Sequence, residues 1–320
     1  MKPFNPAIGI SNAHSQTLFP SLFRKLEDLD YDIEIFELSD GDFVECYWYN
    51  KQAENAPIVI LFHGLEGSYS SPYIIGMMQT LKSSGYRAVL MHFRGCATKE
   101  NRLARCYHSG ETNDAKEFIY HLRDRYKETS LFAIGYSLGG NMLLKLLGEY
   151  GTQSPLTRAV SISAPLDLSV CANKINKGFS KIYQFRLMRH LKSSLLAKYR
   201  VHDMKNIIGI DEHGVKNMKT FWDFDNIYTG PIHGFRNAQH YYEESSAKGY
   251  LKNIETKTLI IHSLDDPFMT PEILPTSDEV SNSIDLEIYN KGGHVGFVAG
   301  SILRPKYWLE DRIMEYFNRL

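Results

Sequence analysis

One serine lies in the sequence pattern that most directly suggests chemistry. Residues 131–147 read as a short apolar strand, a tight turn and a helix, and the turn spells Gly135-x-Ser137-x-Gly139. In this context the pattern places a serine on a strained strand-to-helix turn, with its Oγ exposed above a sheet. A side chain at either glycine would collide with neighbouring backbone. We therefore favour a nucleophilic Ser137 over an incidental serine at a glycine-rich helix start.

A serine hydroxyl needs a base within hydrogen-bond reach and a third group that orients the base. Of twelve histidines, His294 is the best candidate, because it follows the last predicted strand in a glycine-rich turn that could carry it over Ser137. His262 is the rival, but it lies within or at the tip of a predicted strand, which favours a structural role. His63 and His92 are expected to brace loops through hydrogen bonds.

Two neighbouring carboxylates could supply the third group. Asp265 and Asp266 both follow the predicted strand 256–262. We favour Asp266, which precedes Pro267 in a stiffened turn. Asp265 remains an alternative, and either carboxylate could instead cap a turn or helix.

An acyl-transfer site also needs donors for a developing oxyanion. The first N–H groups of a helix have no intrahelical partner and favour negative charge, which makes the Leu138 N–H one candidate. The second is expected from the loop after the third strand of the sheet. His63-Gly64-Leu65 forms that loop, so the Leu65 N–H is the other candidate.

The elements around these residues alternate between strand and helix. A hairpin of antiparallel edge strands is expected over 33–38 and 42–49, around Asp40-Gly41. Buried parallel strands are expected over 57–62, 86–91, 131–136, 157–163, 256–262 and 284–289. Helices are expected over 72–84, 111–127 and 305–320. This order predicts an α/β fold with a mainly parallel sheet, helices on both faces, and a site at the carboxyl ends of the strands.

Two segments depart from this alternation. The first 30 residues are expected to form an irregular arm ending in a short helix, with a turn-like polar stretch at 12–17. Residues 164–247 are expected to form a helical cap, inserted in an α/β core made of 1–163 and 248–320. No acidic residue occurs from 168 to 202, where eight lysines and arginines alternate with apolar residues at helical spacing. We expect the apolar face to pack on the core and the cations to be solvated; contact with an anionic lipid surface is the alternative.

Composition excludes several classes of protein. The chain has 320 residues, 43% hydrophobic and 23% charged, with a net charge of −1, which gives no case for nucleic-acid binding. Its four cysteines form no C-x-x-C pair, which suggests neither a zinc site nor a thioredoxin-like motif, and no H-E-x-x-H motif or carboxylate cluster appears. No metal or other cofactor is expected. Scattered thiols, no signal peptide and no membrane-spanning run favour a cytoplasmic protein. Nothing in the sequence indicates an oligomeric state.

Several motifs together resemble the α/β-hydrolase superfamily, and more narrowly the YheT-type hydrolases of bacteria, which are related to the eukaryotic α/β-hydrolase domain proteins 1 and 3. The resemblance covers nearly the whole chain and rests on segments 12–17, 63–68, 92–96, 135–141, 224–225, 229–231, 265–267 and 293–296. It implies an α/β-hydrolase fold and cleavage of small-molecule carboxylic esters, with lipid esters as substrates in some relatives. It also implies that Ser137, Asp266 and His294 form the catalytic triad.

Two departures from the relatives bear on function. Eukaryotic relatives often begin with a membrane anchor, and no such segment is expected here. Some lipid-active relatives carry an H-x-x-x-x-D motif linked to acyl transfer, and no histidine of this chain has that spacing. Thioester cleavage or acyl transfer on the same site, or ligand binding without catalysis, are the alternatives to ester hydrolysis.

Overall fold

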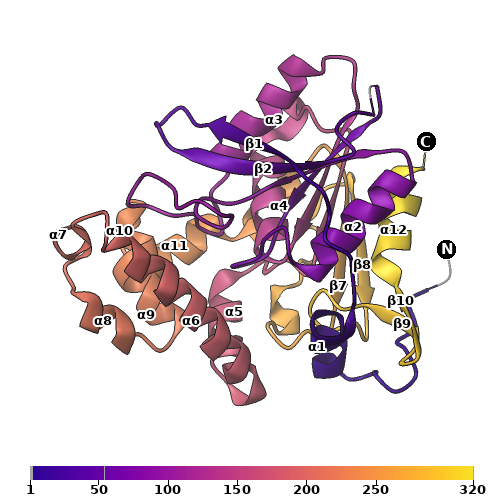
Figure 1. Cartoon of the computed structure of the whole chain (residues 1–320). Helices are drawn as coiled ribbons and strands as arrows, with labels where there is room; N and C mark the ends of the chain where they lie inside the picture. The colour runs from indigo at the N-terminus through magenta and orange to yellow at the C-terminus, as the bar shows by residue number, and fades with distance from the viewer. Residues whose placement is uncertain (1–2, 54, 320) are drawn as a thin grey trace.

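A central eight-stranded sheet organises the protein (Figure 1). The computed structural model describes residues 3–53 and 55–319, so residues 1–2, 54 and 320 of the predicted core lie outside it. The strands follow the order β1-β2-β4-β3-β5-β6-β7-β8. Only β1 with β2, and β2 with β4, pair antiparallel in this sheet, which confirms the predicted mostly parallel arrangement. Their bounds are β1 Asp32–Glu37, β2 Phe43–Tyr49, β3 Ile58–Phe62, β4 Arg87–Met91, β5 Leu131–Tyr136, β6 Arg158–Ile162, β7 Lys257–Ser263 and β8 Ile284–Tyr289.

Helices cover both faces of this sheet, as predicted (Figure 1). On one face α3 (Asn113–Arg125) and α4 (Leu138–Tyr150) pack against Ile58 and Ile60 of β3. On the other face α2 (Pro72–Ser83) and α12 (Trp308–Phe317) pack against Val59 and Leu61. Successive side chains of a strand point to opposite faces, so a strand covered on both sides must be apolar throughout. Each fully buried side chain of this kind contributes roughly 1.5–3 kcal/mol through burial.

The antiparallel hairpin forms as predicted, but only β1 is an edge strand. β2 lies second in the sheet, and six of its seven residues are buried. Its alternating sequence therefore does not reflect an exposed face. The buried Glu45 carboxylate accepts hydrogen bonds from the Lys99 N–H (2.7 Å) and the Thr98 hydroxyl (2.8 Å), which satisfies this charge inside the protein.

The N-terminal arm differs from the prediction. The Asn12 side chain accepts a hydrogen bond from the Ser15 N–H (2.8 Å) and caps a helix, α1, which spans Ala13–Phe23. Residues 12–17, which were expected to form a turn, therefore form the N-cap and the beginning of helix α1. The short helix lies in the middle of the arm, and residues 24–31 are irregular. Asparagine favours both turns and helix N-caps, so composition alone did not separate them.

The predicted helix 305–320 begins three residues late. Residues Arg304–Tyr307 form β10, which pairs antiparallel with β9 (Val298–Ser301) in a separate two-stranded sheet. The N-terminal arm extends this sheet, because the Ala7 N–H donates to the Val298 carbonyl (2.8 Å). Pairing with the nearby strand β9, which the N-terminal arm holds on its other side, overrides the helix-starting tendency of Pro305.

Helices fill the segment between β6 and β7 and gather on one side of the molecule, away from α2 and α12 (Figure 1). The α-helices are α5 Leu168–Ile175, α6 Lys181–Lys198, α7 Met204–Ile208, α8 Glu212–Asn217, α9 Phe221–Phe224, α10 Gly230–Ile232 and α11 Ala238–Ser245. A π-helical turn, η3 Asp225–Thr229, joins α9 to α10. Short 3-10 turns elsewhere are η1 Gly151–Gln153, η2 Gly178–Ser180, η4 Ala247–Asn253 and η5 Pro271–Ile273. The division into core and cap at 164–247 remains a prediction.

The faces of α6 differ from the expected apolar and basic faces. Ile182 and Phe185 are 58% and 72% exposed, whereas Lys198 is buried and donates to carbonyl groups of the core. Lys192 donates to two cap carbonyls. The prediction of solvated cations is therefore wrong for Lys198, whereas Lys192 is half-buried. In residues 3–53 and 55–319, no helix has the length and apolar character needed to cross a membrane.

Candidate active site

Ser137 lies at the sharp turn between β5 and α4. Its φ of +52° is unfavourable for a residue with a side chain, and its N–H donates to the Ile162 carbonyl at 2.8 Å. A Cβ at Gly135 would lie 2.4 Å from the Gly139 carbonyl oxygen, and one at Gly139 would lie 2.5 Å from that of Phe62. The turn is closed only because these positions lack side chains, as predicted.

The structure brings together the three residues that the sequence singled out. His294 Nε2 lies 2.9 Å from Ser137 Oγ, and His294 Nδ1 lies 2.7 Å from Asp266 Oδ2. An ionised carboxylate is only an acceptor, so Nδ1–H donates to Asp266 and Nε2 is left to accept from the serine hydroxyl. His294 and Asp266 are both buried. The arrangement can remove a proton from Ser137 and hold it on the imidazole.

The neighbouring aspartates point to different partners. Asp266 Oδ1 accepts from the Phe268 N–H (2.8 Å), while Oδ2 faces His294. Asp265 Oδ1 instead accepts from the Gly293 N–H (2.9 Å), and its Oδ2 has no partner among the described residues. Asp265 thus holds the turn that carries His294 rather than the imidazole itself.

The other candidate histidines are engaged elsewhere. His63 Nε2 accepts from the Phe93 N–H (3.1 Å), so its Nδ1–H donates to the Gly64 carbonyl (2.7 Å). His92 links the loop at Tyr69 to strand β2 in the same way, through the Tyr69 N–H (3.1 Å) and the Glu45 carbonyl (2.9 Å). Burial lowers the pKa of His63 to about 3 and that of His92 to about 4, so both are neutral. His262 is buried within β7, where burial lowers its pKa.

Both predicted oxyanion donors are free. Tyrosine hydroxyls accept from the N–H groups of Gly64 and Glu66, at 3.0 Å each. The Leu65 N–H between them, and the Leu138 N–H at the start of α4, have no acceptor in the described part of the chain. Gly64 lies against Ser137, because a Cβ at this glycine would be 3.2 Å from the Ser137 Cβ. Two unpaired donors therefore flank Ser137.

The N-terminal helix holds the loop of His294, a role that the sequence analysis missed. Thr17 Oγ1 accepts from the His294 N–H at 2.9 Å. Gln16 bonds to both backbone groups of Val298, at 2.7 and 2.9 Å, and is fully buried. The polar stretch 12–17 was the signal for this contact, although nothing in the sequence placed it beside residue 294.

Aromatic side chains support His294 from the other side. The Phe268 ring stacks on the imidazole, with ring centroids 4.1 Å apart and planes 14° from parallel. Tyr183 of α6 contacts Phe268, and its hydroxyl hydrogen-bonds to His14 Nδ1 (3.0 Å). A continuous chain of contacts therefore runs from α1 through α6 to the imidazole.

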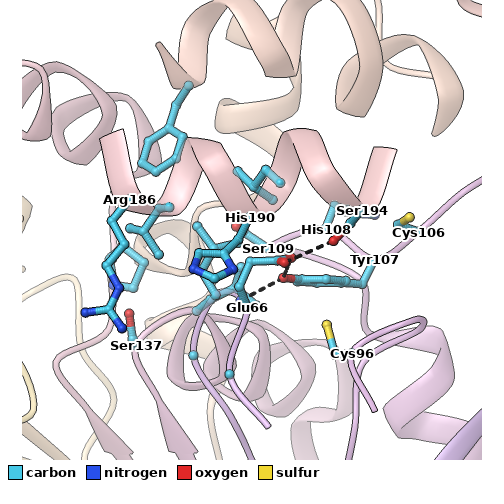
Figure 2. Close-up of a pocket in the computed structure, with 18 of the residues that line it drawn as sticks. Glu66, Cys96, Cys106, Tyr107, His108, Ser109, Ser137, Arg186, His190 and Ser194 are labelled. Carbon is cyan, nitrogen blue, oxygen red and sulfur yellow. Dashed lines mark hydrogen bonds between the residues drawn. The ribbon is translucent and has the colours of Figure 1, made fainter. Parts of the chain in front are cut away.

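A cavity of about 850 Å³ opens onto Ser137 (Figure 2). Helix α6 crosses it and sends Arg186, His190 and Ser194 into it from one helical face. Apolar side chains make up much of the wall, among them Leu168, Ile175, Leu187, Leu191, Leu195 and Phe224. Within residues 3–53 and 55–319, no group of three or more histidine, cysteine or acidic side chains could hold a metal ion.

The sequence has counterparts among known proteins. Residues 57–301 match the family model described as the alpha/beta hydrolase fold. The chain belongs to the α/β-hydrolase family. This α/β-hydrolase is 40% identical over 317 residues to YheT of Escherichia coli (strain K12), a proposed esterase, with 98% of this chain and 93% of YheT covered.

More distant relatives carry enzymatic names. The α/β-hydrolase is 26% identical to human phospholipase ABHD3, covering 98% of this chain and 78% of ABHD3. It is 29% identical to the monoacylglycerol lipase of Saccharomyces cerevisiae, covering 80% of this chain and 56% of the lipase. The chain is therefore an enzyme of the esterase- and lipase-type α/β-hydrolases.

Solved structures agree on the fold. The Pyrococcus furiosus esterase Pf2001 superposes with a TM-score of 0.59 at 17% identity, covering 100% of this chain and 98% of that esterase. An esterase of Exiguobacterium antarcticum gives 0.54 at 17% identity, covering 88% and 98%. At these identities the likeness shows the α/β-hydrolase fold alone.

Proposed function

We propose that this protein is a serine hydrolase that cleaves carboxylic esters through Ser137, His294 and Asp266. The hydrogen-bonded series from Ser137 Oγ to the Asp266 carboxylate carries the proposal, because it supplies nucleophile, base and orienting group in one line. The free Leu65 and Leu138 N–H groups also support the proposal, because they could stabilise the oxyanion that forms on the ester carbonyl.

The reaction follows from this geometry. As Ser137 Oγ attacks the ester carbonyl, its proton passes to His294 Nε2, and the Leu65 and Leu138 N–H groups stabilise the oxyanion. His294 then gives the proton to the departing alcohol, which leaves an acyl-enzyme on Ser137. Water, activated by the same imidazole, releases the acid. Asp266 fixes the imidazole orientation and stabilises its charged form.

The cavity supports a lipid-like ester as substrate. Its apolar wall and volume of about 850 Å³ suit an acyl chain, and the relatives named above include a phospholipase and a monoacylglycerol lipase. In this proposal residues 164–247 form a cap, inserted in a core of 1–163 and 248–320, and α6 is the part of the cap that closes the cavity. The length of the bound acyl chain then depends on how α6 packs.

We also propose that the cap contacts an anionic lipid surface at its α6 end. Three large apolar side chains there are more than half exposed: Phe179, Ile182 and Phe185. Exposed cations outside the cavity lie close to them in the sequence, namely Lys177, Lys181 and Arg189, and no acidic residue occurs from 168 to 202. Exposed apolar side chains together with cations favour binding to an anionic membrane surface.

The four cysteine thiols are consistent with a reducing compartment. Cys46, Cys96, Cys106 and Cys171 are all free, which is usual for proteins of the cytoplasm. We therefore propose that the enzyme acts there. Fractionation of cells that express the tagged protein should recover it with cytoplasmic markers, and recovery with periplasmic or extracellular markers would contradict the assignment.

Fluorophosphonate labelling tests the serine hydrolase proposal directly. The purified protein should be labelled at Ser137 and should hydrolyse a panel of nitrophenyl esters of graded acyl length. Ser137→Ala should lose the label and several orders of magnitude of turnover, because the triad acts as a unit. Ser84→Ala, at an exposed serine outside the site, is the matched control. Near-normal turnover in Ser137→Ala would exclude the proposal, and binding without turnover would favour a ligand-binding protein.

A further inference from the structure

A carboxylate lines the cavity beside the proposed oxyanion donors and has no role in the reaction above. Glu66 follows Leu65 directly and adopts a φ of +53°, which is unfavourable for a residue with a side chain. The Tyr107 hydroxyl accepts from the Glu66 N–H (3.0 Å) and donates to Glu66 Oε1 (2.9 Å). Ser194 of α6 donates to Oε2 (3.2 Å). One hydrogen bond to the Glu66 backbone and two to its carboxylate therefore fix this residue in one position.

The Glu66 carboxylate still has unused hydrogen-bonding capacity. Each carboxylate oxygen can accept two hydrogen bonds, and each accepts one from the protein. No lysine, arginine or histidine lies within ion-pair distance of Glu66 in the part of the chain that the structure describes. Burial raises the pKa of Glu66, so the carboxyl group is poorly solvated where it stands. A ligand group that donates a hydrogen bond would relieve this desolvation.

The surroundings favour a neutral ligand group over an ion. An anion at this place would be repelled by Glu66. A cation would be repelled by the Arg186 guanidinium, which projects from α6 into the same cavity (Figure 2). Arg186 itself makes no hydrogen bond or ion pair with the described residues. A hydroxyl group of a ligand can donate its proton to an unused lone pair of the Glu66 carboxylate without bringing a charge into the cavity, because the Tyr107 and Ser194 hydroxyls donate their own protons to the other lone pairs.

We propose that Glu66, with Ser194, binds a free hydroxyl on the alcohol portion of the ester, so that the enzyme prefers esters of polyhydric alcohols such as glycerol monoesters. The inference rests on the proposed ester hydrolysis at Ser137. Figure 2 shows Glu66, Tyr107 and Ser194 grouped beyond Ser137 and Arg186 along the cavity, so an ester held at Ser137 would extend toward them. Glu66 is then a specificity-determining residue and takes no part in the chemical steps.

Two esters with the same acyl chain separate this role from general catalysis. Glycerol monooctanoate has two free hydroxyls on its alcohol, and ethyl octanoate has none. The measured quantity is the ratio of their kcat/KM values. Glu66→Gln keeps the size of the side chain but removes its charge, and hydrogen bonds to charged groups are the stronger ones. The ratio should fall about tenfold, mainly through a higher KM for the glycerol ester.

Controls distinguish a subsite from a structural contact. Ser194→Ala removes the contact between α6 and Glu66 but leaves the carboxylate in place, so the ratio should fall less than in Glu66→Gln. Glu212→Gln changes an exposed cap glutamate by the same chemistry and should leave the ratio unaltered. A parallel loss on both esters in Glu66→Gln, or an unchanged ratio, would mean that Glu66 only holds the loop, and the subsite would be rejected.

The same experiment separates this inference from the proposed function. If the wild-type protein hydrolyses both esters and the ratio does not respond to Glu66→Gln, only the hydroxyl subsite fails. If the wild-type protein hydrolyses neither ester and Ser137 resists the fluorophosphonate, the serine hydrolase proposal fails and the subsite falls with it.

Discussion

Each of Ser137, His294 and Asp266 is held in position by a hydrogen bond that involves a backbone N–H group. The Ser137 N–H is held by the Ile162 carbonyl, and the His294 N–H by Thr17. Asp266 receives the Phe268 N–H on the oxygen that does not face the imidazole. Because each side chain stands on a fixed backbone, the three can meet without being ordered at the moment of reaction, which is the main benefit of preorganisation.

The two neighbouring aspartates provide a prediction at the scale of single residues. Asp266→Asn should lower kcat by about 10³–10⁴-fold, because an amide no longer fixes the required imidazole tautomer or stabilises its charge. Asp265→Asn should lower kcat by less than about tenfold, because the amide oxygen can still accept from the Gly293 N–H. Steady-state turnover of one nitrophenyl ester measures both. The reverse order of severity would show that the acid is Asp265.

Helix α1 connects parts of the molecule that are far apart in sequence. Thr17 and Gln16 bond to the segment 294–298, whereas His14 bonds to Tyr183 of α6 and contacts Phe179. One short helix therefore touches both the loop of the proposed base and the helix over the cavity. A change in the position of α6 would be felt at His294 through Tyr183 and the Phe268 ring.

The exposed end of α6 provides a prediction at the scale of elements. Changing Lys177, Lys181 and Arg189 together to glutamine should weaken binding to anionic phosphatidylglycerol vesicles by roughly 100-fold, since each basic residue contributes about 1 kcal/mol near such a surface. These cations are exposed and lie outside the cavity lining. Vesicle sedimentation at low salt measures the effect, and raised salt should weaken binding of the unaltered protein.

A second triple variant serves as the control: it changes the net charge by the same amount, but at a different part of the surface. Lys127, Lys252 and Lys257 are exposed near the starts of the parallel strands β5 and β7, at the other end of the sheet from the site. Changing these three to glutamine should leave vesicle binding nearly intact. Equal loss in both triple variants, or equal binding to neutral phosphatidylcholine vesicles, would reject a specific surface on α6.

Buried ionisable groups set how the whole molecule responds to acid. Burial lowers the pKa of His63 to about 3 and of His92 to about 4, against about 6.5 in an unfolded chain. Below about pH 6.5 the unfolded state therefore binds more protons than the folded state. As the pH is lowered below this value, the free energy of unfolding should decrease by about 1.4 kcal/mol per pH unit for each histidine. Asp225 acts in the opposite sense, because burial raises its pKa to about 6. Two histidines outweigh one aspartate, so acidification is a net loss.

This balance can be measured by urea unfolding between pH 7 and pH 5. The free energy of unfolding should decrease toward pH 5. Asp225→Asn removes a buried charge while its amide oxygen can still accept from the Tyr242 hydroxyl, so this variant should be more stable at pH 7 by about 3 kcal/mol and lose stability more steeply on acidification. Asp124→Asn, at an exposed position, should follow the unaltered protein. A flat free energy of unfolding from pH 7 to pH 5 would contradict the prediction.

The sequence by itself determined the features that depend on local pattern. Continuous apolar runs mark strands covered on both faces, so the mostly parallel sheet could be predicted from them. The glycine spacing at 135–139 marks a turn that tolerates no side chain, which placed Ser137 at a strand-to-helix turn. Histidines and aspartates just after strand ends could be proposed as partners because such ends meet at one edge of the sheet.

Only the tertiary structure decided which way neighbouring side chains face and what distant segments do. Asp265 and Asp266 are adjacent and chemically alike, and only the folded loop turns one to Gly293 and the other to His294. Pairing with β9 made β10 out of the start of a predicted helix, and a long-range hydrogen bond gave α1 its hold on the His294 loop. The sequence also did not predict the exposed apolar side chains of α6 or the inward-facing Glu66. Burial depends on which element packs opposite a residue, and no local sequence pattern encodes that.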